Sequence, residues 1–71
     1  MKPLSGKSFI KILEQKGWIL KRINGSHHIF THTEKTEIIS VPVHKNNDLK
    51  IGLQKKLMGI ADIKESDLYQ K

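Results

Sequence analysis

The residues best suited to chemistry are His27 and His28, which follow Gly25 and Ser26 at the start of a strand-like stretch. Imidazole titrates near neutral pH, so a histidine can both accept and donate a proton there. Side chains alternate between the two faces of a strand. If Phe30 points into the core, His28 shares its buried face and His27 projects from the opposite, open face. The sequence therefore indicates His27 as the exposed acid–base candidate.

Other chemistries fit these residues less well. Residues four apart on a strand lie about 13 Å apart, so His28 and His32 would not readily share a metal ion. The chain has no cysteine, and His44 lies in a separate loop. Ser26 directly precedes His27, so their side chains should point to opposite faces rather than form a nucleophile–base pair. We therefore expect no metal site, no cofactor and no serine nucleophile.

The charge of the chain favours a polyanionic partner. Thirteen Lys and Arg against seven Asp and Glu give a net charge of +6. Residues 1–33 carry six basic residues and one acidic one, and residues 45–56 carry four lysines and one aspartate. Such concentrated positive charge attracts nucleic acid. Gly25 and Ser26 should shape a turn, with Ser26 available to a phosphate oxygen. The candidate phosphate contacts on or beside the strands are Lys21, Arg22, Lys45 and Lys50.

Two amphipathic helices are expected, one toward each end of the chain. Ser5 is a predicted N-cap for the first helix, over residues 6–16, and Leu4 is placed to pack on Phe9 as a hydrophobic staple. The second helix is predicted from an apolar stripe at i, i+4 and i+7, which consists of Leu53, Leu57 and Ile60. A final turn of helix is expected over 66–70.

Three strand-like stretches lie between these helices, at 18–23, 27–33 and 37–41. The pair Asn24-Gly25 predicts a tight turn after the first stretch, and Pro42 should end the third because a central strand would not tolerate it. A polar loop over 43–48 follows. The order α-β-β-β-α indicates an α+β fold, in which a three-stranded antiparallel sheet carries two helices on one face. The other face is then open to solvent or a ligand.

The length predicts one domain, residues 1–71, with a core at about 5–60 and a C-terminal extension at 61–71. A chain this short buries only about 60% of its unfolded surface, which disfavours a large cofactor cavity. No apolar run reaches the roughly 20 residues needed to cross a bilayer, and the N-terminus lacks a signal-peptide core. We therefore expect no membrane partner and a cytoplasmic location.

Several motifs follow one another in an order that carries a family resemblance. They are Gly17-Trp18, then Arg22, then Gly25-Ser26-His27-His28-Ile29-Phe30-Thr31-His32, then Val41-Pro42-Val43-His44-Lys45, and then Leu49-Lys50-Ile51-Gly52. Together they resemble the HicA family, also called YcfA-like, the toxin halves of HicA–HicB toxin–antitoxin pairs. The resemblance extends from about residue 7 to residue 60. Two features differ: Ile51 stands where the family often has proline, and residues 64–71 extend beyond the shared core.

The resemblance implies a double-stranded-RNA-binding-domain-like fold and the activity of a ribosome-independent mRNA interferase, an endoribonuclease. It also implies that activity depends on His27 and that a HicB-type antitoxin masks this residue. RNA carries its own nucleophile, the 2′-hydroxyl, so such an enzyme can work without a metal. His27 would then be the general base or acid, with His44 a weaker candidate for the second proton transfer. The alternative is a non-catalytic module that binds double-stranded RNA and leaves it intact.

Overall fold

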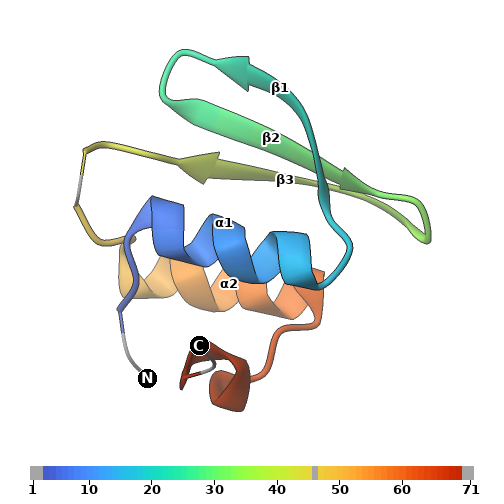
Figure 1. Ribbon diagram of the computed structural model, residues 1–71. Helices are drawn as coiled ribbons and strands as arrows, with labels where there is room; N and C mark the ends of the chain where they lie inside the picture. The colour runs from blue at the N-terminus through green and yellow to red at the C-terminus, as the bar shows by residue number, and fades with distance from the viewer. Residues whose placement is uncertain (1–2, 46, 70–71) are drawn as a thin grey trace.

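A helix, three antiparallel strands and a second helix follow one another along the chain, which confirms the α+β fold expected from the sequence. The computed structural model describes residues 3–45 and 47–69. Figure 1 shows the sheet on one side of the two long helices and the short C-terminal helix on their other side. The elements are α1 (Gly6–Gln15), β1 (Ile19–Asn24), β2 (His27–His32), β3 (Lys35–Pro42), α2 (Ile51–Ala61) and the 3-10 helix η1 (Glu65–Tyr69).

The sheet has the strand order β1-β2-β3, and both neighbouring pairs are antiparallel. β3 makes the main contacts between the sheet and the two helices, and β1 lies farthest from them (Figure 1). Three apolar side chains of β2 and β3 on the helix face are fully buried: Phe30, Ile39 and Val41. On the other face Ile38 is 58% exposed. One face is therefore covered and the other is open, as predicted.

The exposed strand β1 extends beyond the cover that the helices provide. All six of its residues are exposed. Leu20 pairs with Phe30 and Ile23 pairs with His28, so both lie on the helix face of the sheet. Their exposed fractions are nevertheless 41% and 56%, because the helices lie beneath β3 rather than beneath β1.

The start of α1 follows the expected capping pattern. The Ser5 hydroxyl accepts a hydrogen bond from the Ser8 backbone N–H at 3.2 Å, which satisfies one of the free donors of the first turn. Leu4 and Phe9 are both buried in the same core, as a hydrophobic staple requires. The helix ends at Gln15, and Gly17 follows with a φ of 93°. Only glycine adopts that left-handed conformation without strain.

The first tight turn lies one residue later than the sequence indicated. Its two residues are Gly25 and Ser26, while Asn24 belongs to β1 and pairs with His27. Gly25 has a positive φ of 63°, whereas the φ of Ser26 is not positive. A positive φ at the first turn residue alone is typical of a type II′ turn, in which glycine is preferred at that place.

The third strand is longer than predicted and includes Pro42 rather than ending before it. β3 is an edge strand, and the Val43 N–H donates to the Ser26 carbonyl at 2.7 Å, which makes these two residues a hydrogen-bonded pair. The adjacent pair, His27 and Pro42, is then non-hydrogen-bonded, so the proline nitrogen faces the open edge. Pro42 therefore breaks no ladder bond.

Trp18 lies before β1 rather than inside it, and it is only 2% exposed. Its indole meets the His32 ring edge-on, with ring centroids 5.3 Å apart and an interplanar angle of 67°. The Nδ1 of His32 accepts the Glu34 backbone N–H at 3.0 Å, and its Nε2 lies 3.1 Å from the Lys16 carbonyl. The Nε2 must therefore carry the proton, and this histidine is a structural one that joins the end of α1 to β2.

The second helix has its buried face slightly rotated from the predicted stripe. Leu57 is buried and Leu53 and Ile60 are partly buried, in agreement with the pattern. Gln54 was not expected in the core, yet it is fully buried. Its Oε1 accepts the backbone N–H of Leu4 at 2.9 Å. The Leu4 carbonyl in turn accepts the Leu49 N–H at 2.7 Å, so the N-terminal segment is fastened to the start of α2.

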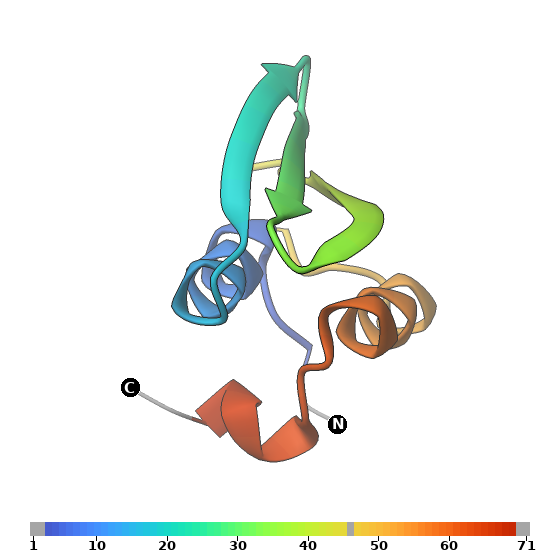
Figure 2. The same cartoon turned by 90° about the vertical axis from the view of Figure 1, so that its right-hand side faces the viewer.

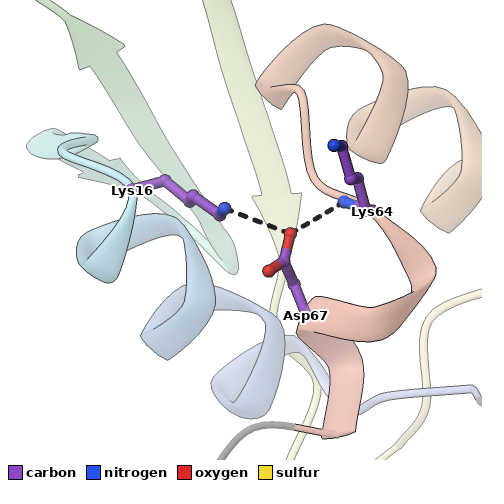
Figure 3. A network of polar contacts seen from close by, with 3 residues as sticks. All are labelled: Lys16, Lys64 and Asp67. Carbon is purple, nitrogen blue, oxygen red and sulfur yellow. Dashed lines mark hydrogen bonds and ion pairs between the residues drawn. The ribbon is translucent and has the colours of Figure 1, made fainter.

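Residues 63–69 pack beneath the helices, on the side away from the sheet (Figure 2). Ile63 and Leu68 are buried members of the core. Asp67 Oδ2 accepts the Lys64 backbone N–H at 2.9 Å and lies 3.1 Å from Lys16 Nζ (Figure 3). The Lys64 N–H, followed by the Lys16 ammonium, holds the pKa of Asp67 below its ordinary value of 3.8. The short helix begins at Glu65, one residue before the predicted 66–70, and residue 70 lies outside the described residues.

Candidate functional site on the open face of the sheet

The two adjacent histidines lie on opposite faces of β2, as the position of Phe30 predicts. Phe30 is fully buried, His28 is half-buried with its Nδ1 shielded from solvent, and His27 is exposed. In the described part of the chain the His28 Nδ1 has no hydrogen-bond partner. His27 is thus the member of the pair whose imidazole can meet a ligand.

His27 is held between two neighbours on the open face. It pairs with Asn24 on β1 and with Pro42 on β3. Cross-strand partners point to the same face, and in non-hydrogen-bonded pairs their side chains lie especially close. The Gly25–Ser26 turn precedes it, and the hydrogen bond from Val43 to the Ser26 carbonyl continues the ladder past the strand end. Backbone pairing therefore fixes His27 on both sides.

A β-bulge brings Arg22 to the same face. The pairing of β1 with β2 shifts between Leu20 and Arg22, so Lys21 is the extra residue. Leu20 pairs with the core residue Phe30, and unbroken alternation would place Arg22 on that inner face as well. With the bulge, Arg22 pairs with Ile29, which shares the open face with His27. The bulge therefore places the Arg22 side chain on the same sheet face as His27.

A cavity of about 410 Å³ adjoins this end of the sheet. Its lining includes Pro42, which pairs with His27, together with His44 and Lys50. The structure therefore brings His27, Ser26, His44 and Lys50 to one end of the molecule. Lys21 and Lys45 are exposed nearby along the chain, but among the described residues no hydrogen bond or ion pair ties either to His27.

The basic side chains around the site form no ion pairs with carboxylates among the described residues. Within residues 3–45 and 47–69, no ion pair involves Arg22, Lys45 or Lys50, whereas Lys16 is paired with Asp67. Lys50 is also the N-cap of α2, and no side chain caps that helix. The free N–H groups of its first turn add partial positive charge beside the cavity. These cations and N–H groups are available to a polyanion.

The histidines do not assemble into a metal centre in the part of the chain that the structure describes. No group of three or more His, Asp or Glu side chains lies close enough there to hold an ion. His27 and His28 point to opposite faces, and both ring nitrogens of His32 already meet backbone groups. What the arrangement offers is one exposed imidazole, neighbouring cations and a cavity, which suits proton transfer on a bound anion.

Sequence reasoning missed three contributors to this site: Asn24, Pro42 and the cavity. Asn24 was assigned to the turn and Pro42 to the end of a strand, although both flank His27. The Val-Pro-Val-His motif was noticed, but its meaning depends on strand register. The register can be predicted only if Pro42 is placed on an edge strand, with its nitrogen, which carries no hydrogen, facing away from the sheet.

The fold and the site define a small basic α-β-β-β-α domain that presents a histidine on the open face of its sheet. Residues 6–66 match the family described as HicA toxin of bacterial toxin-antitoxin. This match covers most of the 71 residues, and the chain belongs to the HicA toxin family. It is thus the toxin component of a toxin–antitoxin system, and the family implies a cognate antitoxin. Comparison with curated proteins gives no match. None of the helices formed by the described residues is long and apolar enough to span a membrane.

Proposed function

We propose that this toxin is a metal-independent endoribonuclease, an mRNA interferase, whose general acid–base group is His27, and that a HicB-type antitoxin inhibits it. The observation that carries the proposal is the placement of His27. It is exposed on the open sheet face, fixed between Asn24 and Pro42, and accompanied by unpaired cations.

The chemistry needs no external nucleophile, because RNA supplies its own 2′-hydroxyl. The His27 imidazole removes the proton from that hydroxyl, and the oxygen attacks the adjacent phosphorus. The bond from phosphorus to the 5′-oxygen breaks, and the leaving oxygen takes up a proton. The products are a 2′,3′-cyclic phosphate and a free 5′-hydroxyl. His44, at the cavity beside Pro42, is the candidate for the second proton transfer.

Cations next to this histidine would stabilise the charge that develops on the phosphorane. Arg22 lies on the same sheet face, and Lys50 lies at the start of α2, where the helix N-terminus adds to its charge. Lys21 and Lys45 are exposed on the flanking strand and loop, where they can follow the RNA backbone. Ser26 and the backbone of the Gly25 turn supply further polar groups to a phosphate oxygen.

Inhibition would follow from covering the open sheet face. A toxin with a net charge of +6 attracts an acidic partner, and complementary charge speeds such association. A HicB-type antitoxin that lies over His27 would exclude RNA. Purification with the product of the neighbouring reading frame should give a complex without nuclease activity, and a complex that cleaves RNA at the full rate would contradict the masking.

The direct test replaces each of the adjacent histidines in turn. His27→Ala should lower the rate of RNA cleavage by about 10²–10⁴-fold, the usual contribution of one acid–base group. His28→Phe, on the opposite face, should cleave at nearly the wild-type rate. Both should keep the wild-type circular dichroism spectrum. Undiminished cleavage by folded His27→Ala would overturn the assignment.

The nucleophile and the alternative function are tested with modified substrates. An RNA carrying one 2′-deoxyribose at the cleavage position should resist cleavage there, and its continued cleavage would exclude attack by the 2′-hydroxyl. Activity should persist in excess chelator. If the wild-type protein binds double-stranded RNA and never shortens it, the chain is a binding module and the catalytic proposal is wrong.

A further inference from the structure

The cavity beside Pro42 has the composition of a site for a flat, partly polar ring. Its apolar wall consists of Pro42, Leu49 and Leu53, of which Leu49 is buried. Its polar wall includes the exposed side chains of Asn47 and Asp48. Small-molecule sites typically combine apolar surfaces with a few polar groups that fix orientation, in volumes of about 300–1,000 Å³. At about 410 Å³ the cavity has room for one nucleobase with part of its ribose.

The position of the cavity connects it to the proposed reaction. Pro42 lines the cavity and is also the cross-strand partner of His27 on the open face. Directly paired residues have Cβ atoms about 4.5–5.5 Å apart. The nucleotide next to a phosphate bound at His27 would then lie beside Pro42, which also lines the cavity.

We propose that this cavity is a base-binding subsite that selects the nucleotide next to the cleaved phosphate, with Asp48 favouring bases that carry an exocyclic amino group. The inference rests on the proposed RNA cleavage for its biological meaning. The recognition itself is a property of the cavity and can be measured without cleavage.

The carboxylate of Asp48 determines which bases the subsite should prefer. Among the described residues no hydrogen bond or ion pair engages the Asp48 carboxylate, although its backbone forms an isolated bridge with Ser5. A carboxylate accepts hydrogen bonds and donates none. It pairs with the amino group of cytosine, for example, but meets a carbonyl oxygen at the same place on uracil. The subsite should therefore distinguish cytidine from uridine.

Another cavity serves as a contrast. It has a volume of about 390 Å³ and lies at the opposite end of the helices, where Lys16, His32 and Asp62 contribute to its lining. Two of its polar side chains already have partners: Lys16 pairs with Asp67, and both nitrogens of His32 meet backbone groups. Asp62, an exposed carboxylate at that end of the helices, serves as a matched control for Asp48.

Nucleosides provide a probe that lacks phosphate and so avoids non-specific attraction to lysines. In an NMR titration of the wild-type protein, cytidine should shift the backbone amides of residues 47–53, and uridine should bind more weakly by about fivefold or more. Asp48→Asn should remove this difference, and Asp62→Asn should preserve it. Equal binding of cytidine and uridine, or shifts confined to other residues, would overturn the inference.

Mapping of cleavage positions on a mixed-sequence RNA links the subsite to catalysis. Asp48→Asn should change the distribution of cleavage positions on that RNA. If RNA is cut but the distribution is unchanged, the subsite is wrong and the proposed nuclease stands. If RNA is never cut while the nucleoside preference is present, the nuclease proposal fails and the base-binding cavity remains.

Discussion

Gln54 is a polar residue in the middle of an apolar core, and its position is explained by the backbone it serves. Its Oε1 accepts the N–H of Leu4, a buried residue 50 positions earlier in the chain. A buried N–H without a partner would be costly, because it loses water and gains nothing in return. Gln54 therefore allows Leu4 to enter the core while its backbone stays hydrogen-bonded.

Replacement of Gln54 by leucine should lower the free energy of unfolding by about 1–3 kcal/mol, the cost of leaving a buried donor unsatisfied. The volume is nearly conserved, so the loss would reflect the hydrogen bonding of the Gln54 amide rather than a cavity. Urea unfolding measures the change, and Gln15→Leu on the exposed surface of α1 is the control. Equal stabilities of the two variants would show that the hydrogen bond contributes little.

The environments of individual residues were partly readable from the sequence. Strand alternation, anchored on Phe30, correctly assigned His27 to the exposed face and His28 to the inner face. Gln54 was missed because periodicity counts only apolar side chains, and a buried amide is recognisable only through its partner. The roles of His27, His44 and the lysines in catalysis stay predictions.

At the scale of helices and strands, some features could be predicted from local sequence patterns and others could not. The helix starting after Ser5 was predicted closely because its cap and staple are local signals. The bulge at Lys21 could not be predicted from a local signal. Lys21 and Arg22 are both basic, so residue type does not show which of them lies on the open face. The bulge depends on how β1 pairs with β2, and it decides that Arg22 shares the open face with His27. Pairing register, not residue type, builds that part of the site.

The Asp67 carboxylate contributes to the attachment of the short helix η1, so this attachment should depend on pH. The Lys64 N–H and the Lys16 ammonium lower the pKa of Asp67 in the folded state. A group with a lowered folded pKa stabilises the fold above its unfolded pKa and loses this contribution as the pH falls through the folded value. The contribution of Asp67 should thus be complete at neutral pH and disappear below its ordinary value of 3.8.

The comparison of wild type with Asp67→Asn isolates this effect. The variant should be less stable at pH 7, and the difference should shrink as the pH falls below 3.8. Thermal unfolding followed across this range gives both curves, with Asp62→Asn as the control. A difference between wild type and Asp67→Asn that stays constant with pH would mean that the contact acts through packing alone.

At the scale of the whole molecule, the sheet, the helices and η1 form successive layers with different roles (Figure 2). The core lies between the sheet and the helices, and the C-terminal segment closes the helices from below. The open sheet face is left without a structural task, and β1 extends past the helices with Ile19, Leu20 and Ile23 exposed. Because the open sheet face and β1 add little to the core, they are the surfaces that the proposed function assigns to RNA and to the antitoxin.

This layering predicts that RNA binding depends on where a positive charge lies, not only on the total of +6. Each phosphate contact releases counterions, so the logarithm of the affinity falls with the logarithm of salt by about 0.7 per contact for a single strand. With His27→Ala to prevent cleavage, Arg22→Gln on the open face should lower that slope by about 0.7. Lys64→Gln removes the same charge beside η1, beyond the helices (Figure 3), and should leave the slope unchanged. If both substitutions lower it equally, RNA is attracted by net charge and the sheet face has no special part in binding.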